Sequence, residues 1–226
     1  MTSVFDLVLC FLEGCLAPKD FITQFKKDEA VYTWLQSIVP KGKKYYICHI
    51  TPNAYGQNSH VLEEIPYDVK IAFRNIERQS HSSPWCLYYY FHMELAKLIE
   101  EAFPNEKLKL RDDIKERYFF ELNAIPRYVC SKEVYESGIV DNVIDNLPNE
   151  MSKDEKTIVC RKTINDIFHV RNRYPCWRRE SEWPIGSLGV PMRFVTQYSS
   201  GQGNYTYEFE DVCNGEKRLV VQKNEI

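Results

Sequence analysis

Apolar residues recur at helical spacing along most of the first 170 positions. The clearest case covers residues 85–103, where a single apolar stripe ends at Pro104. The sequence Ser152-Lys-Asp-Glu155 is a capping box, in which the hydroxyl and the carboxylate both accept from backbone amides. The body of the chain is therefore predicted to be helical, with further helices at about 4–12, one or two within 18–38, and others at 66–78, 112–122, 131–147 and 152–170.

Near the C-terminus the pattern changes from helical spacing to alternation, which indicates strands. Three short strands are expected at 192–198, 205–212 and 217–222, joined by turns that contain glycine. The alternation predicts one buried apolar face, formed by Phe194, Tyr207, Phe209, Leu219 and Val221. The fold class is thus predicted to be α+β, a mostly helical body with a C-terminal three-stranded antiparallel β-meander.

A single domain is expected over residues 1–226. Within it, the helical body covers about 1–172, and a proline-rich linker with the β-meander covers about 173–226. The β-prone segments 44–50 and 60–65 favour a hairpin with a long loop.

Composition narrows the class of protein. Hydrophobic residues make up 44% and charged residues 27%, as in an ordinary folded protein. The net charge of −3 argues against nucleic-acid binding, which needs clustered cations. The first apolar run is too short to span a bilayer and has no basic flank, so we expect no membrane interaction and a cytoplasmic location. The eight cysteines show no Cys-x-x-Cys spacing and are expected to be free thiols.

No motif assigns a catalytic residue. Ser187 lies in Gly186-Ser-Leu-Gly189, which lacks the Gly-x-Ser-x-Gly spacing of a nucleophile turn. Asp141 and Asp145 lie one helical turn apart, a pairing that is common on solvated helix faces. Histidines and cysteines do not occur at zinc-ligand spacing, so neither a metal nor a cofactor is expected; the nearest sets are Cys48-His49 with His60, and His81, Cys86 and His92.

The C-terminal segments carry a resemblance. They are Trp177, Glu182-Trp-Pro184, Gly189-Val-Pro-Met-Arg-Phe-Val-Thr-Gln197, and the stretch from Tyr207 to Gln222. With Phe11-Leu-Glu-Gly14 and Trp34-Leu-Gln-Ser-Ile-Val-Pro40, this pattern resembles uncharacterised cytosolic bacterial proteins encoded beside polymorphic or contact-dependent toxins as immunity proteins. The resemblance implies a protein that acts by binding a partner protein, and it transfers no functional residue.

We therefore expect a non-enzymatic binding protein, an immunity protein that occludes the active site of a toxin domain. The alternative is a small hydrolase or nuclease whose site is assembled from distant residues. A binder that covers a basic cleft should use exposed carboxylates near aromatic anchors. The sequence offers two such groups: Glu180 and Glu182 between Trp177 and Trp183, and Glu208 and Glu210 on one side of the middle strand.

Overall fold

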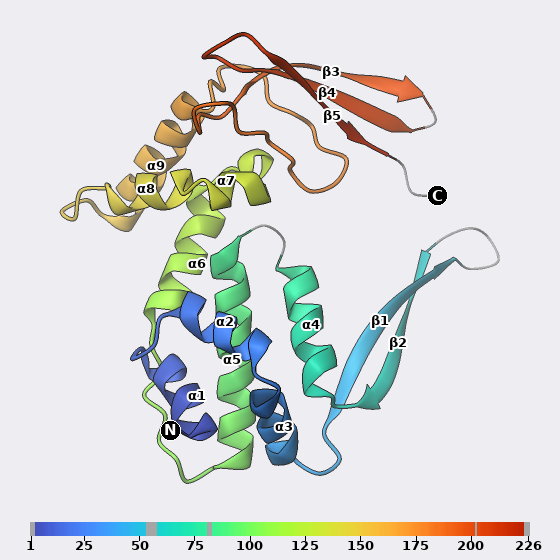
Figure 1. The fold of residues 1–226 in the computed structure, drawn as a ribbon, viewed down its shortest axis with the longest axis vertical. Coiled ribbons are helices and arrows are strands. Elements are labelled where there is room, and N and C mark those ends of the chain that lie inside the picture. Colours follow the sequence, from blue (N-terminus) through green and yellow to red (C-terminus); the bar gives the residue numbers. More distant parts are fainter. Residues whose placement is uncertain (1–2, 53–57, 81–82, 202, 224–226) are drawn as a thin grey trace. The chain divides into compact units, whose positions relative to one another are not determined.

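The structure is a computed structural model that describes residues 3–52, 58–80, 83–201 and 203–223, with side chains at 47–62 and 79 left aside. The chain divides into two compact units. Unit 1 contains residues 1–80 and 85–114, and unit 2 contains residues 81–84 and 115–226 (Figure 1). Among the described residues, no helix is both long enough and apolar enough to cross a membrane.

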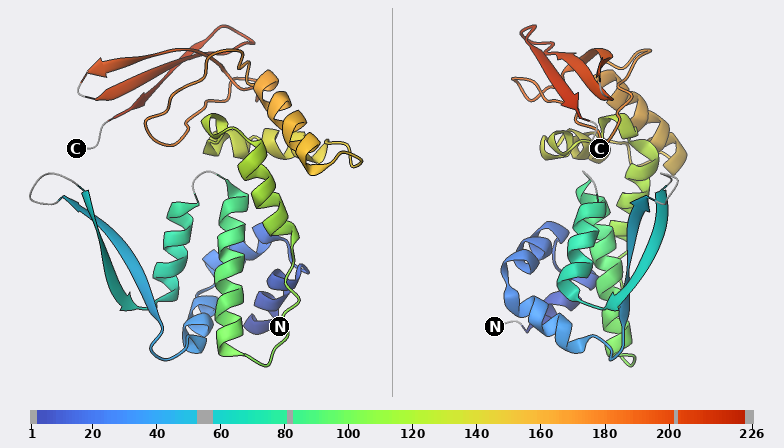
Figure 2. Two further views of the ribbon diagram at one scale, coloured as in Figure 1. Left: turned by 180° about the vertical axis from the view of Figure 1, so that it is seen from behind. Right: turned by 90° about the vertical axis from the view of Figure 1, so that its right-hand side faces the viewer.

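Unit 1 is a helical unit in which shorter helices lie around α5 (Figure 2). Aromatic side chains fill its core, and the rings of Phe11 and Phe21 stack with centroids 4.2 Å apart. The predicted apolar stripes of the first helices are confirmed as buried. The helices are α1 (Val4–Glu13), α2 (Pro18–Lys27), α3 (Glu29–Ile38), α4 (Val69–Gln79) and α5 (Pro84–Ala102).

A two-stranded hairpin connects α3 to α4, as the sequence predicted. Its strands, β1 (Lys44–Pro52) and β2 (Asn58–Pro66), pair antiparallel with Lys44 opposite Pro66. The expected helix start at Pro66 is wrong, because that residue ends β2. Helix α4 starts three residues later, where the Asp68 carboxylate accepts from the Ile71 amide at 2.9 Å.

Unit 2 combines helices with the C-terminal sheet. Its elements are α6 (Asp113–Ala124), which begins at the unit boundary, the short helix η1 (Arg127–Val129), α7 (Lys132–Glu136), α8 (Ile139–Asp145), α9 (Lys153–Ile167), and the strands β3 (Arg193–Gly201), β4 (Asn204–Glu210) and β5 (Lys217–Gln222). The strands form one antiparallel sheet in the order β3-β4-β5. The predicted α+β class, with a helical body and a C-terminal meander, is therefore confirmed.

Two predicted helices of unit 2 differ from the prediction: one is divided and the other ends early. The single helix predicted over 131–147 is two helices, since Gly138 between them has a φ of 75°, which an α-helix does not contain. Helix α9 has the predicted capping box at Ser152 and Glu155. It stops at Ile167 rather than near 170 because His169 adopts a φ of 53°.

The sheet buries one face, but two of the residues predicted to lie on that face are exposed. Tyr207 and Phe209 on β4 are fully buried, as expected. Leu219 and Val221 are instead 56% and 50% exposed, and Val220 stands opposite Tyr207 on the inner side. The loop closed by the Asp211 amide and the Glu216 carbonyl, 2.7 Å apart, sets this register. When the pairing register shifts by one residue, every side chain of the strand moves to the opposite face of the sheet.

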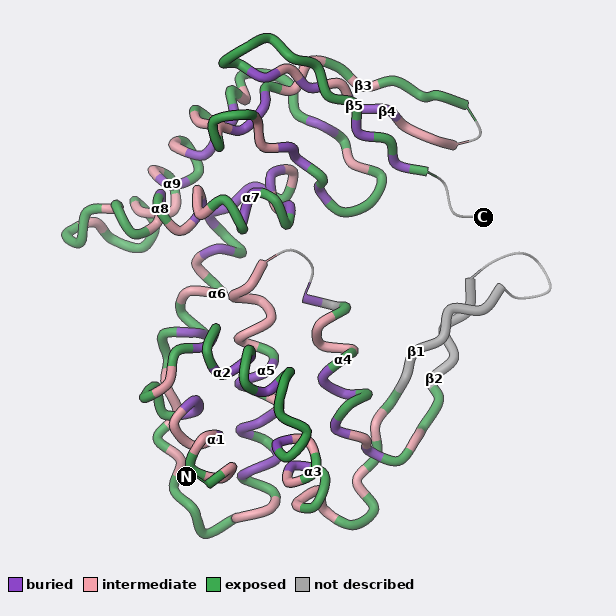
Figure 3. Tube along the Cα trace, viewed as in Figure 1, coloured by how far each residue is buried: buried purple, intermediate pink, exposed green. Residues whose placement is uncertain are grey.

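Residues 115–172 belong with the sheet rather than with the first helices. Buried side chains from α6, α8 and α9 share one hydrophobic cluster with Trp183, Tyr207 and Phe209. Figure 3 marks the buried positions along the chain. Part of the helical body expected over about 1–172 therefore packs with the linker and the meander. That the whole chain forms a single domain stays a prediction.

Candidate functional site

The sheet of unit 2 has a second face, which we call the outer face. It consists of the side chains that alternate with Tyr207 and Phe209 on β4, together with their cross-strand partners. Residues directly opposite in an antiparallel pair project to the same side, so three rows cross this face. The rows are Tyr198-Thr206-Val221, Thr196-Glu208-Leu219 and Arg193-Glu210-Lys217.

One part of the outer face is apolar. Tyr198, Leu219 and Val221 are 47%, 56% and 50% exposed. Val221 and Tyr198 flank the same residue, Thr206, and Leu219 lies two positions from Val221 on the same strand. Strand geometry therefore makes these three side chains neighbours on one surface.

The other part of the outer face is charged but balanced. The Lys217 ammonium lies 2.7 Å from a Glu208 oxygen, and the Arg193 guanidinium lies 2.6 Å from a Glu210 oxygen. The hydrogen bond to Glu208 raises the pKa of Lys217 above its ordinary value. Glu208 and Glu210 do share a side, as predicted, but two cations neutralise their charge. Long-range attraction of a basic partner should therefore be weak.

The two predicted tryptophan anchors lie on the inner side of the sheet. Trp183 has no exposed area, and its indole N–H donates to the Met192 carbonyl at 2.8 Å. Trp177 is half-buried, and its ring stacks on Phe209 with centroids 5.9 Å apart. The expectation of a surface anchor is wrong for Trp183, because its ring fills the core between the helices and the sheet.

A glutamine near the C-terminus holds the segment that carries Glu180 and Glu182. The buried Gln222 side chain accepts from the amides of Arg178 and Arg179 at 2.9 and 3.1 Å. Its amide group donates to the Glu180 carbonyl and to the Glu182 carboxylate, both at 2.8 Å. Since Gln222 alternates with Val221, this segment runs beside the inner face. The structure therefore separates Glu180 and Glu182 from Glu208 and Glu210.

The sequence-based interpretation missed Gln222, although one signal was present. Gln222 is the polar end of an otherwise apolar run, Leu219-Val-Val-Gln222. A buried amide must find partners for its donors and its acceptor. Four of the partners come from a segment about 40 positions earlier in the chain, so spacing alone could not identify them.

A cluster of charges in unit 2 is the best place to look for acid–base chemistry, and we call it the Arg117 cluster. The Arg117 guanidinium donates to Glu121 at 3.0 Å, to Asp141 at 2.6 Å and to Asp145 at 3.1 Å. The Ser83 hydroxyl donates to the other oxygen of Glu121 at 3.0 Å. Burial raises the pKa of Glu121, which is only 4% exposed, against the lowering effect of Arg117 and Ser83.

All three carboxylates of the Arg117 cluster bind the same guanidinium. Burial would lower the pKa of Arg117, but hydrogen bonds and charge interactions with the carboxylates raise it overall. Asp141 and Asp145, predicted to lie one turn apart on a solvated face, do lie together on α8 and share this partner. These bonds occupy carboxylate oxygens that a substrate or a metal ion would otherwise use. The cluster therefore has the features of a structural network.

Other candidate groups also have structural roles. Ser187 lies in a turn, where its hydroxyl and amide both donate to the Asp211 carboxylate at 2.8 Å. These bonds, with that from the Cys213 amide, hold the pKa of Asp211 below its ordinary value. A Cβ at Gly186 would lie 2.7 Å from an Asp211 oxygen, so only glycine fits there.

The spacing of histidines and cysteines predicted no metal site. Among the side chains that the structure describes, no three His, Cys, Asp or Glu residues form a group that could hold a metal ion. His92 is buried with its Nε2 atom 3.1 Å from the Leu12 carbonyl. The side chains of Cys48, His49 and His60, and the whole of His81, lie outside the described part.

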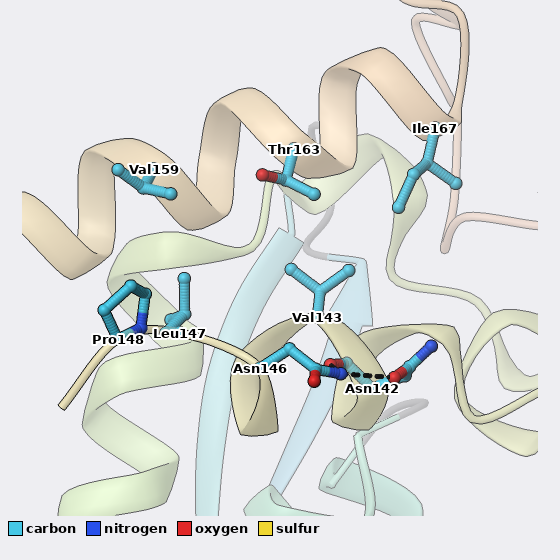
Figure 4. A pocket seen from close by; sticks show the side chains of 8 residues that line it. All are labelled: Asn142, Val143, Asn146, Leu147, Pro148, Val159, Thr163 and Ile167. Carbon is cyan, nitrogen blue, oxygen red and sulfur yellow. Dashed lines mark hydrogen bonds between the residues drawn. The ribbon is translucent and has the colours of Figure 1, made fainter.

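An open groove lies between α8 and α9 (Figure 4). Its volume is about 300 Å³, and Val143 and Asn142 on one side face Val159, Thr163 and Ile167 on the other. The amide of Asn146 donates to the Asn142 side chain at 2.6 Å. The lining consists of apolar and uncharged polar side chains, so the groove offers no group for acid–base or nucleophilic chemistry other than one threonine hydroxyl.

The outer face, the Arg117 cluster and the groove are thus the features from which a function can be inferred. In comparisons with protein-family models, with curated proteins and with solved structures, nothing matches this chain.

Proposed function

We propose that this chain is a non-enzymatic protein-binding protein, an immunity protein that binds a toxin domain and covers its active site. The outer face of the C-terminal sheet is the binding surface. The observation that carries the proposal is the exposure of Tyr198, Leu219 and Val221 on one face of the sheet, with ion pairs on the same face. An apolar centre with a polar rim is the usual anatomy of a protein interface.

The side chains packed behind the outer face are compatible with a binding surface. Phe209 and Tyr207 on the same strand are fully buried, and they contact the rings of Trp177 and Trp183. A face held by a packed aromatic layer loses little conformational entropy when a partner docks. The balanced charges of the rim favour a partner surface that is itself mixed in charge, rather than a strongly basic cleft.

The enzyme alternative receives less support from the described residues. A hydrolase or nuclease needs a nucleophile beside a base, or carboxylates available to bind a metal. The Arg117 cluster gathers residues from distant parts of the chain, as that alternative requires, but the guanidinium occupies its carboxylates. Ser187 has a carboxylate partner and no described histidine beside it.

The first step of the test is to search the genes next to this one for a toxin-like domain, which is then expressed. Cells that express the toxin domain alone should stop growing, and co-expression of this chain should restore growth. In the purified system, toxin activity should fall in proportion to added chain and reach its minimum at one chain per toxin domain, since occlusion is stoichiometric. Each purified component is assayed alone as the control.

Two results would contradict the proposal. One is the lack of a toxin-like neighbour that the chain protects against. The other is loss of toxin activity at far less than one chain per toxin, which would mean that this chain acts catalytically and would favour the hydrolase alternative.

A further inference from the structure

Two cysteines meet where α1 ends. Gly14 terminates the helix in the left-handed region, with a φ of 93°. The Leu16 amide then donates to the Cys10 carbonyl at 2.9 Å, so the chain folds back along the last helical turn. A helix that ends on a left-handed glycine brings the side chain after the glycine against the last turn. Here those two side chains are Cys15 and Cys10.

The two thiols are near each other and differ in their surroundings. Cys15 is one of the groups close enough to raise the pKa of the Cys10 thiol. Cys15 is exposed, whereas Cys10 is partly buried. Burial, followed by the neighbouring Cys15, Asp6 and Glu13, raises the pKa of Cys10 above its ordinary value. Because Cys15 is the exposed thiol of the two, its sulfur is the one that an oxidant in solution reaches first.

We propose that Cys10 and Cys15 form a redox-active pair, which hydrogen peroxide converts reversibly into a disulfide. The fold-back of the chain at Gly14, which brings Cys15 beside the last turn of α1, and the exposure of Cys15 are the observations that support it. The bond would join the last turn of α1 to the segment that leads into α2. This inference is independent of the proposed binding function.

The chemistry balances in two steps. The Cys15 thiolate attacks one peroxide oxygen, the O–O bond breaks, and hydroxide leaves, which gives a sulfenic acid at Cys15. The Cys10 sulfur then attacks the Cys15 sulfur, the S–O bond breaks, and the oxygen leaves as water with the Cys10 proton. Two thiols lose two electrons in total, and one peroxide is reduced to two water molecules.

The test uses the full-length protein, reduced and then freed of reductant. The protein is treated with an equivalent of hydrogen peroxide, blocked with an alkylating reagent and cut with a protease that cleaves after glutamate. Because Glu13 lies between the two cysteines, cleavage there leaves their fragments joined only through a disulfide. We expect the linked fragments as the main oxidised product, a loss of two titratable thiols per chain, and full recovery with dithiothreitol.

Variants identify the order of events. In Cys10→Ser, a sulfenic acid should accumulate at Cys15 and react with dimedone, while the control Cys213→Ser, which removes another exposed thiol, should still form the pair. Circular dichroism checks that each variant is folded. The proposal is overturned if Cys15 is oxidised while Cys10 stays a free thiol in the wild-type protein, or if the pair is oxidised no faster than Cys176 and Cys213.

Discussion

Replacing Arg117 by methionine is expected to destabilise the protein by about 3–5 kcal/mol at neutral pH, the range for a buried ion pair that loses one partner. Glu121 is 4% exposed and depends on the Arg117 guanidinium to compensate its charge. Methionine has a similar length, so the loss reports the unpaired charge rather than an empty space. The free energy of unfolding from urea titration measures the effect.

Acid should reduce the loss in Arg117→Met. Burial already raises the pKa of Glu121, and removal of the guanidinium raises it further. A carboxyl whose folded-state pKa lies above its unfolded-state pKa stabilises the fold below the unfolded value, and this contribution disappears as the pH rises through the folded value. The loss should therefore be largest at neutral pH and should shrink as the pH falls through the folded-state pKa of Glu121.

A double variant separates charge from packing. Adding Glu121→Gln to Arg117→Met removes the buried charge and should restore part of the lost free energy. The matched control is Asp145→Asn, which loses an exposed partner of the same guanidinium and should cost less than about 1 kcal/mol. A loss in Arg117→Met that neither acid nor Glu121→Gln reduces would show that the guanidinium does not serve Glu121.

Phe209→Ala is expected to cost about 3–5 kcal/mol, the range for removing a large aromatic side chain from a core. Phe209 has no exposed area, and its ring contacts those of Trp177, Trp183 and Phe194. Tyr198→Ala, on the outer face of the same sheet, is the control and should change the stability little. A loss below about 1 kcal/mol for Phe209→Ala would mean that the sheet does not depend on its aromatic layer.

Local patterns predicted most of the elements correctly, because helical spacing and strand alternation are properties of neighbouring residues. The capping box at Ser152 and the buried stripes of the first helices are examples. The errors come from positions that local pattern does not decide. Gly138 divides a helix through its backbone conformation, and the loop from Asp211 to Glu216 sets which residues of β5 face inward.

For the candidate site as well, the sequence predicted only what residues close together in the chain determine. Glu208 and Glu210 share a side because strand residues two apart always do. Leu219 and Val221 lie on the same side as these glutamates because of the way β5 pairs with β4. Glu182 does not lie there, because its carboxylate is bound to Gln222. Trp183 was expected to be an aromatic anchor beside Glu180 and Glu182, although its ring packs on Phe168 at the end of α9. Contacts of this kind are set by tertiary structure.

The most direct test of the outer face is the affinity of the toxin domain for the double variant Leu219→Lys/Val221→Lys. Both side chains are exposed, so the melting temperature should stay within a few degrees of the wild-type value. The control is Ile158→Lys, which changes an exposed apolar residue on α9. Placing two ammonium groups in the apolar centre of an interface should raise the Kd about 100-fold or more, while the control leaves it unchanged. An unchanged Kd in the folded double variant would contradict the assignment of the outer face as the binding surface.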